Sequence, residues 1–162
     1  MKFCKVRDVK SPVRGTGKAA GIDFFIPNDF TPYRLNPQHD VLIPSGIKIE
    51  IPEGYMLMAA DKSGVVTSYM AAFKAGRKPK KEAFSSPVII GAKIVDEDYQ
   101  GEIHIHLINT GCDAICLQPG MKIAQFILVP VSYEELEEVS KSEIFSQTSE
   151  RGNGAFGSTG SY

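Results

Sequence analysis

The feature of this 162-residue chain that most constrains its fold is a series of short apolar runs, each bounded by proline or another turn residue. Runs of this length suit β-strands, and proline does least harm at the edge of a strand, where few ladder hydrogen bonds are lost. The runs occupy residues 3–9, 22–26, 41–43, 47–51, 55–59, 88–95, 103–108, 114–117 and 123–131. The pattern predicts an all-β fold, with one helical candidate at residues 68–75.

One strand is predicted with particular clarity at residues 103–107, where apolar and polar side chains alternate as in a half-buried strand. The β-branched pair at residues 94–95 predicts a second strand just before it. The residues between them, with Asp96 and Tyr99 among them, would form the tip of a hairpin. Working residues are often found on loops held by a rigid support, so this tip is a candidate for chemistry.

Composition excludes several classes of function. The chain has 18 basic and 19 acidic residues and a formal net charge of −1, so no overall positive potential draws it to nucleic acid or to an anionic membrane. An anionic ligand must therefore be met by local charges. The N-terminal stretch is charged rather than a secretion signal, and no apolar run approaches the roughly 20 residues of a membrane span. We expect a cytoplasmic protein, in the host's cytoplasm if a phage encodes it.

Two short segments carry residues suited to an anionic ligand. Gly21 permits a close backbone approach, and Asp23 follows it at the start of an apolar strand. Lys62, Ser63 and Gly64 present an ammonium, a hydroxyl and a glycine amide in succession, a combination that suits phosphate oxygens. Each segment alone is more often a solvated turn than a binding site. The spacing of a phosphate-binding P-loop is absent from the chain.

Two further features point to ligand binding. Gln125 stands in a strand that is apolar on both faces, where an unpaired buried amide costs about 1–3 kcal/mol. Its side chain therefore either ties neighbouring backbone together or contacts a ligand. The tail carries a single guanidinium, Arg151, and a single ring, Phe156, among glycines and hydroxyls. Glycine-rich tails are usually disordered, but these two side chains suit a flap that closes over a nucleotide.

The histidines do not predict a metal site. His104 and His106 share one face of a predicted strand, but His39 is the only other histidine, and no cysteine pair joins them at metal-ligand spacing. The basic segment at residues 74–81 has few aromatic neighbours and is typical of a solvated loop rather than of a nucleic-acid surface. We therefore expect no membrane and no direct nucleic-acid partner.

Five segments, taken in their order, resemble the five motifs of the trimeric deoxyuridine triphosphatase (dUTPase) family. They are Ala20-Gly-Ile-Asp23, Lys62-Ser-Gly64, Ile94-Val-Asp-Glu-Asp-Tyr-Gln-Gly-Glu102, Gly120-Met-Lys-Ile-Ala-Gln125 and Arg151-Gly-Asn-Gly-Ala-Phe-Gly-Ser-Thr-Gly160. The third and fifth are the most specific, and the resemblance covers nearly the whole chain. It implies a jelly-roll-like β-barrel subunit at residues 1–150, a homotrimer whose sites are shared between subunits, and a flexible lid at residues 151–162.

The resemblance also implies a function, the Mg²⁺-dependent hydrolysis of dUTP to dUMP and pyrophosphate, which keeps uracil out of DNA and supplies dUMP for thymidylate synthesis. Asp96 would deprotonate the water that attacks the α-phosphorus, and Tyr99 would pack on the deoxyribose and exclude a 2′-hydroxyl. Asp23 would hold a water of the Mg²⁺ that the triphosphate carries. The other residues implied in substrate binding are Lys62, Ser63, Gly64, Ile90, Ile94, Val95, His104, Gln125, Arg151, Phe156, Gly157, Ser158 and Thr159.

The chain departs from the family pattern at several positions. Lys62 stands where the family usually has arginine, so a point charge replaces a two-pronged guanidinium. Asp61 replaces a usual proline, and Ile90 stands where a polar residue often lines the uracil groove. Residues 69–86 resemble an insertion.

Two other functions remain open at this point. A deoxycytidine triphosphate deaminase has a similar fold and ligand, and it needs a general acid or base near the cytosine ring; Glu102 is the candidate in this sequence. A nucleotide-responsive binding protein could use the same pocket as a switch and the insertion as its docking surface. The presence of Asp96 favours a catalytic site over a pocket that only binds.

Overall fold

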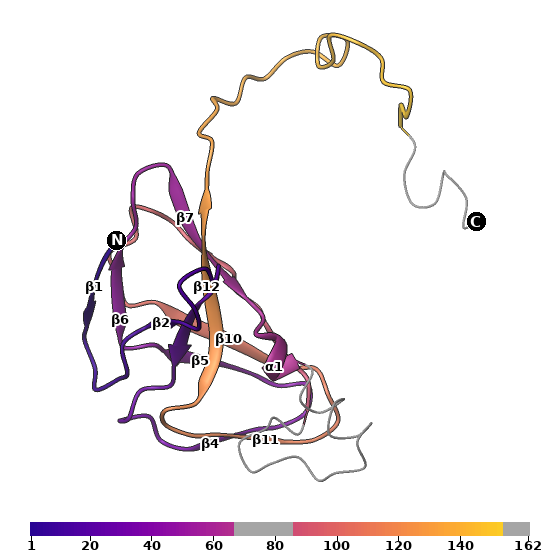
Figure 1. The fold of residues 1–162 in the computed structure, drawn as a ribbon. Coiled ribbons are helices and arrows are strands. Elements are labelled where there is room, and N and C mark those ends of the chain that lie inside the picture. The colour runs from indigo at the N-terminus through magenta and orange to yellow at the C-terminus, as the bar shows by residue number, and fades with distance from the viewer. Residues whose placement is uncertain (67–85, 154–162) are drawn as a thin grey trace. The chain divides into compact units, whose positions relative to one another are not determined.

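The computed structural model describes residues 1–66 and 86–153 of the chain (Figure 1). The chain divides into two units, Met1–Ser132 and Tyr133–Tyr162. All described strands and the one described helix belong to the first unit. The helix is α1 (Ser63–Val66), and the strands are β1 (Lys2–Lys5), β2 (Val13–Arg14), β3 (Ile22–Phe25), β4 (Tyr33–Leu35), β5 (Asp40–Pro44), β6 (Ile47–Glu50), β7 (Tyr55–Ala60), β8 (Val88–Ile90), β9 (Ile94–Val95), β10 (His104–Asn109), β11 (Ile115–Leu117) and β12 (Lys122–Pro130).

The strands of the described part form four sheets, and their pairings are antiparallel. The largest sheet has the order β2-β3-β12-β7-β9, and a three-stranded sheet has the order β5-β10-β8. Two small sheets consist of β1 with β6 and of β11 with β4. The long strand β12 runs through the middle of the first unit, beside β7 (Figure 1). It joins parts of the chain that are far apart in sequence.

One hydrophobic core is shared by the four sheets. Phe24 of β3 and Phe126 of β12 meet with ring centroids 4.4 Å apart and planes at 47°. Leu57 of β7, Leu107 of β10 and Leu35 of β4 are fully buried in the same cluster. Burying a side chain of this size contributes roughly 1.5–3 kcal/mol, which makes the core the main source of stability. The sheets are thus held against one another by apolar contacts.

The all-β prediction is confirmed. Each predicted apolar run overlaps at least one strand, and the alternation at residues 103–107 is observed as a buried apolar face and a more exposed face that carries both histidines. The sequence does not predict β2 and β4, because they are only 2 and 3 residues long and mostly exposed. Short edge strands of this kind have no apolar pattern of their own.

The predicted hairpin at residues 94–107 is wrong. β9 pairs with β7, with Val95 opposite Leu57 and Ile94 opposite Met58. β10 pairs with β5 on one side and with β8 on the other, so both of its edges are occupied. The connection from β9 to β10 therefore passes from one sheet to another. The apolar run 88–95 likewise contains two strands, β8 and β9, which lie in different sheets.

Several predictions lie outside what the structure describes. The predicted helix at 68–75 falls outside the described residues, as does all of the predicted insertion at 69–86 except Ser86. In the second unit, residues 133–153 are exposed and contain no helix or strand. The division into a domain of residues 1–150 and a lid of residues 151–162 stays a prediction. No helix in the described part of the chain is long and apolar enough to cross a membrane.

Candidate functional site

A carboxylate held by two lysines is the centre of the first group of site residues. The side chain of Asp23 on β3 is only 7% exposed. Lys62 Nζ donates to Asp23 Oδ1 at 2.7 Å, and Lys122 Nζ donates to Oδ2 at 2.8 Å. Burial raises the pKa of the Asp23 carboxyl, but the hydrogen bonds from Lys122 and Lys62 outweigh it, so the pKa lies below its usual value. Asp23 is therefore an anion, and these three side chains carry a net positive charge.

Gln125 joins three of the predicted segments. It lies on β12, opposite Asp23 of β3 on one side and opposite Ala60 of β7 on the other. Its Nε2 donates to the backbone carbonyl of Asp61 at 2.9 Å. Its Oε1 lies so close to Gly21 that a Cβ at that glycine would be 2.1 Å away, so a larger residue there would have to displace the Gln125 side chain. Gln125 therefore ties neighbouring backbone together, and its contact with a ligand stays a prediction. We call Asp23, Lys62, Lys122 and Gln125 the lysine cluster.

The segment before Asp23 is fixed by a residue that the sequence does not single out. Arg14 on β2 donates from Nη1 to the carbonyl oxygens of Ala19 and Ala20, at 2.5 and 2.7 Å. The pairing of Arg14 with Ile22 brings the guanidinium to this loop. No sequence signal distinguishes Arg14 from the other arginines, because its role depends on the pairing of β2 with β3.

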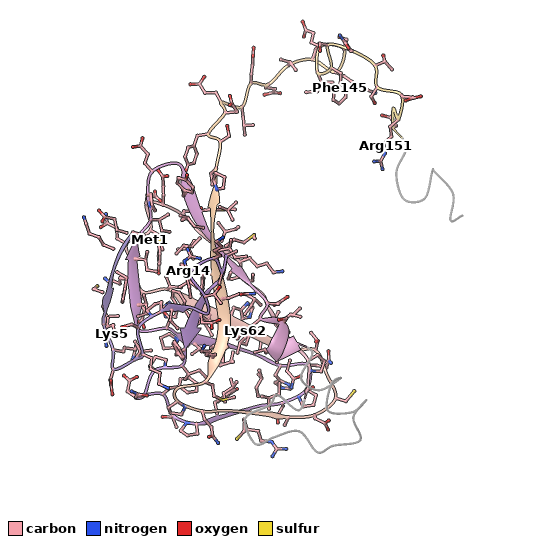
Figure 2. The ribbon with its side chains drawn as sticks, in the orientation of Figure 1. Met1, Lys5, Arg14, Lys62, Phe145 and Arg151 are labelled. Carbon is pink, nitrogen blue, oxygen red and sulfur yellow. The ribbon has the colours of Figure 1, made fainter. Side chains whose placement is uncertain are left out.

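Lys62 lies between the end of β7 and the start of α1 (Figure 2). The Val65 amide donates to the Lys62 carbonyl at 2.8 Å, and Ser63, the first residue of the helix, is exposed. Asp61 fixes the same segment from its other side, because its Oδ1 accepts a hydrogen bond from the Ile90 amide at 2.7 Å. Ile90 itself is 2% exposed, so its side chain belongs to the core. The predicted contact of Ile90 with substrate stays a prediction.

The second group of site residues lies in the connection between β9 and β10, residues 96–103, which we call the Tyr99 loop. The Tyr99 amide donates to the Asp96 carbonyl at 3.2 Å, and the Tyr99 hydroxyl donates to the Glu102 carbonyl at 2.9 Å. The ring covers Gly101 so closely that a Cβ there would be 2.3 Å from the Tyr99 oxygen. His104 Nδ1 lies 2.9 Å from the same Glu102 carbonyl. These contacts fix the ring of Tyr99 on the loop.

Asp96, the predicted base, directly follows β9 and is exposed. Within the described residues no hydrogen bond or ion pair engages its carboxylate. Ile94, which precedes it with Val95 on β9, is 54% exposed. A carboxylate open to water in this way is able to accept a proton from it.

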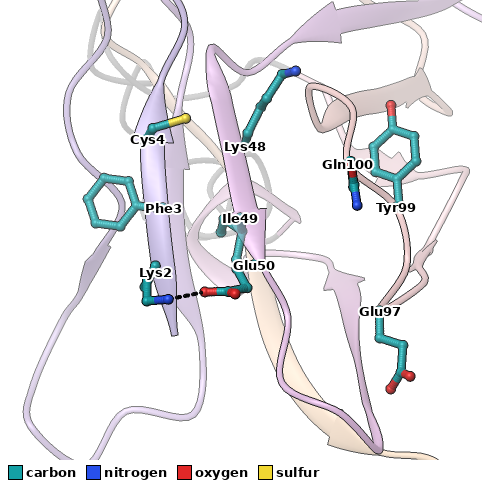
Figure 3. A pocket seen from close by; sticks show the side chains of 9 residues that line it. All are labelled: Lys2, Phe3, Cys4, Lys48, Ile49, Glu50, Glu97, Tyr99 and Gln100. Carbon is teal, nitrogen blue, oxygen red and sulfur yellow. Dashed lines mark ion pairs between the residues drawn. The ribbon is translucent and has the colours of Figure 1, made fainter.

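Tyr99 lines a pocket of about 430 Å³ between its loop and the small β1–β6 sheet (Figure 3). The lining also includes Phe3 of β1, Lys48 and Ile49 of β6 and Gln100 of the loop, and the Phe3 ring points away from Tyr99. Pockets of this size and mixed lining are common sites for small ligands. None of the residues of the lysine cluster lines it.

Glu102, the candidate acid or base of a deaminase, has a structural position. Its Oε1 accepts hydrogen bonds from the Gly46 amide at 2.7 Å and from Arg7 Nε at 2.9 Å. Its side chain is 17% exposed. Gly46 has a φ of 74°, so the carboxylate holds a turn that itself requires glycine. This arrangement does not favour the deaminase.

The lysine cluster and the Tyr99 loop lie toward opposite ends of β7. Ala60 lies beside Gln125 of the cluster, whereas Leu57 lies beside Val95, the residue before Asp96. At roughly 3.3 Å per residue, Asp96 is about 13 Å from the Ala60 level along the strand. It is also displaced sideways, because neighbouring strands lie about 4.8 Å apart. The pairings therefore place the predicted base and the lysine cluster at different levels of β7.

The donor set of the lysine cluster bears on the predicted Mg²⁺. The described residues contain no group of three or more His, Cys, Asp or Glu side chains that could hold a metal ion. Asp23 is the one carboxylate of the cluster. Mg²⁺ in proteins often takes one or two carboxylates and fills its remaining positions with water and substrate phosphates. The residues therefore fit a Mg²⁺ that arrives with a polyphosphate, but not one held by the protein alone.

The predicted lid is described only in part. Arg151 is exposed and belongs to the second unit. Phe156, Gly157, Ser158 and Thr159 lie outside the described residues. Their roles stay predictions.

The described part of the chain is an all-β protein with two cations held at one carboxylate, although the chain as a whole has a net charge of −1. Comparison with known families makes this class specific. The family model described as dUTPase matches residues 7–160. The chain belongs to the dUTPase family.

Individual relatives agree with this assignment. The deoxyuridine 5′-triphosphate nucleotidohydrolase of Chlamydia pneumoniae is 39% identical over 149 residues, which are 92% of this chain and 90% of that protein. A dUTPase of Staphylococcus bacteriophage 80alpha, solved with dUpNHpp, has a TM-score of 0.77 at 23% identity and covers 98% of this chain and 97% of its own. A dUTPase from phage phi11 of S. aureus has a TM-score of 0.69 at 20% identity, with 86% and 96% covered, and is described as revealing the coordination of a structural Mg(II) ion. At these identities the two structures confirm the fold.

Proposed function

We propose that the protein hydrolyses dUTP to dUMP and pyrophosphate. The observation that carries this proposal is the lysine cluster, which presents two ammonium groups around one buried carboxylate in a member of the dUTPase family. A triphosphate bears several negative charges, and local cations stabilise the charge that grows on the leaving pyrophosphate. The relative from Chlamydia pneumoniae, named as a deoxyuridine 5′-triphosphate nucleotidohydrolase, supports the choice of nucleotide. Because this substrate belongs to the nucleotide pool, we expect the protein to act in the cytoplasm.

In the proposed reaction, Asp96 accepts a proton from a water whose oxygen bonds to the α-phosphorus. The bond from that phosphorus to the oxygen bridging the α- and β-phosphates breaks, and pyrophosphate leaves. Lys62, with Ser63 and Gln125, binds the phosphate chain, and Tyr99 packs on the deoxyribose where a 2′-hydroxyl would have no room. The backbone near residues 94–95 and His104 contacts the uracil, and Arg151 with the tail closes over the nucleotide.

We further propose that the nucleotide is bound as its Mg²⁺ complex and that Asp23 holds a water of that ion. When bound, Mg²⁺ neutralises charge on the phosphate oxygens. The support from this chain is the single carboxylate of the lysine cluster, which supplies the one protein anion that a phosphate-bound Mg²⁺ commonly uses.

We propose that the complete site requires more than one copy of the chain. The different levels of Asp96 and the lysine cluster along β7, about 13 Å apart at the usual strand spacing, support this proposal. A second copy that supplies its Tyr99 loop to the lysine cluster of the first would complete the site. We propose a homotrimer with three such shared sites, and light scattering at working concentration tests its mass.

Incubation of the protein with dUTP, dCTP, dTTP and UTP in Mg²⁺, followed by product identification, tests the reaction. We expect dUMP and pyrophosphate from dUTP, with slow or no turnover of the other three. Formation of dUTP from dCTP would replace the proposal with deamination. Binding of nucleotide without any product would replace it with a nucleotide-responsive binding protein.

A further inference from the structure

A β-bulge in β12 turns one lysine toward the candidate phosphate site. In a regular strand, residues three positions apart point to opposite faces, so Lys122 and Gln125 would face opposite ways. The register with β3 shifts between Lys122 and Ala124, and Lys122 comes to lie opposite Phe25 while Gln125 lies opposite Asp23. Phe25 and Asp23 share one face of β3, so Lys122 and Gln125 share a face as well. Bulges often re-aim a side chain in this way beside functional sites.

The three charged side chains of the lysine cluster differ in their exposure to solvent, from Asp23 to Lys62 to Lys122. The Asp23 side chain is 7% exposed, that of Lys62 is 29% exposed and that of Lys122 is 42% exposed. The anion is therefore the innermost group, and the two cations stand between it and solvent. One lysine would neutralise Asp23, so the second leaves an uncompensated positive charge that faces outward.

From this arrangement we propose that Lys122 is a second phosphate-binding cation of the site, and that Asp23 holds Lys122 and Lys62 ready to exchange its own oxygens for those of a triphosphate. The inference rests on the proposed function. Each ammonium has three donors and a flexible stem, so it is able to turn from a carboxylate to a nearby phosphate without a change in the backbone. The exchange also leaves the Asp23 oxygens open to accept hydrogen bonds from water.

Lys10 is the natural comparison for Lys122. Both ammonium groups lie over the ring of Phe25, at 5.6 Å for Lys10 and 5.5 Å for Lys122. Of these two lysines, Lys122 is the one that forms an ion pair with Asp23 in the described part of the chain. Replacement of either lysine by glutamine removes the same charge near the same ring, so a difference between the two variants reports the specific position of Lys122.

The test is calorimetric binding of dUpNHpp, in which NH replaces the oxygen between the α- and β-phosphorus, and of dUMP, each in EDTA and in Mg²⁺. We expect Lys122→Gln to weaken dUpNHpp about tenfold to a hundredfold in both conditions, as the loss of one charged hydrogen bond does. Binding of dUMP should change less than about threefold, because dUMP lacks the β- and γ-phosphates. Lys122→Arg should restore most of the affinity, and Lys10→Gln should stay within about threefold of wild type.

Asp23→Asn supplies an independent readout. If Asp23 competes with phosphate for the two lysines, its loss should leave dUpNHpp affinity in EDTA unchanged or increase it. If Lys122→Gln binds dUpNHpp as tightly as wild type, Lys122 is only a structural partner of Asp23 and the inference is overturned. Equal losses of dUpNHpp affinity in Lys122→Gln and Lys10→Gln would also overturn it. Failure of the proposed function itself would appear in the wild type, as an absence of dUTP turnover, and not in the variants alone.

Discussion

At the scale of single residues, the two carboxylates that the sequence predicts for the site, Asp23 and Asp96, have contrasting surroundings. Asp23 is buried and held by two lysines, whereas Asp96 is exposed, with no described partner for its carboxylate. A buried, doubly bonded carboxylate is suited to organising charge. An open one is suited to taking a proton from water. The surroundings therefore agree with the roles that the family resemblance implies.

Replacement of Asp96 by asparagine tests the proton transfer directly. The amide keeps the size of the side chain but cannot accept the proton, and general base catalysis typically contributes 10²–10⁴-fold. We expect kcat for dUTP to fall at least about a hundredfold, with little change in the affinity for dUpNHpp measured by calorimetry. Asp98→Asn, in the same loop, is the matched control and should keep near wild-type turnover. Turnover of Asp96→Asn close to wild type would mean that the base lies elsewhere.

Gly101 tests the position of the Tyr99 ring without removing the ring. A Cβ at Gly101 would lie 2.3 Å from the Tyr99 oxygen, so Gly101→Ala must displace the ring. We expect the preference for dUTP over UTP, measured as the ratio of kcat/KM values, to narrow by about tenfold or more. Gly15→Ala is the control, because nothing lies within 4 Å of a Cβ at that position. A ratio that stays the same in Gly101→Ala would assign sugar selection to another group.

At the scale of elements, the existence of strands is predictable from the sequence but their partners are not. Apolar periodicity is a local signal, and it predicts β10 and β12 well. The pairing of β9 with β7 depends on which strand edges other segments have already filled, and no local pattern records that. Lys122 is missed for the same reason, because strict alternation assigns it to the face opposite Gln125 and only the bulge reverses this.

Part of the site is nevertheless predictable. The sequence identifies Asp23, Lys62 and Gln125 as candidates, and the structure brings these three together. The residues that hold them, such as Arg14, carry no distinguishing signal, because their function is to bond backbone carbonyls that only the fold brings near. Chemistry-bearing residues are thus easier to recognise than the residues that support them.

Glu102 is one of several residues that attach the Tyr99 loop to the rest of the first unit, beside Glu97 and Ile103. Glu102 accepts hydrogen bonds from the Gly46 amide and from Arg7. Glu102→Ala leaves that partly buried amide without its acceptor, so we expect the free energy of unfolding in urea to fall by about 1–3 kcal/mol. Asp98→Ala removes an exposed carboxylate from the same loop and should change stability by no more than about 0.5 kcal/mol. Equal stability of the two variants would show that the Glu102 contacts contribute nothing.

At the scale of the whole molecule, the positions of the lysine cluster and of Asp96 bear on the proposed homotrimer. In a chain with a net charge of −1, two lysines, Lys62 and Lys122, lie around Asp23 near the Ala60 end of β7. The predicted base follows β9, which pairs nearer the other end of β7. In the proposed homotrimer, a second copy of the chain would bring the two groups together.

Mixing two inactive variants tests this division. Asp96→Asn and Lys62→Gln each damage one half of the site, so each homotrimer should be nearly inactive. In trimers exchanged at random in equal amounts, about a quarter of the shared sites would receive both intact halves. We expect about a quarter of wild-type activity after the two proteins are unfolded and refolded together. No recovery would show that both groups act within one chain.

Because Asp96 and the lysine cluster lie at different levels of β7, we expect activity to depend on protein concentration even where folding does not. The core of the first unit consists of residues from one chain, so we expect a lone subunit to keep its sheets. In the proposed homotrimer, activity would follow mass action, because each shared site would exist only while copies are in contact. Dilution below the dissociation constant should then yield folded protein that has lost its activity, and reconcentration should return it.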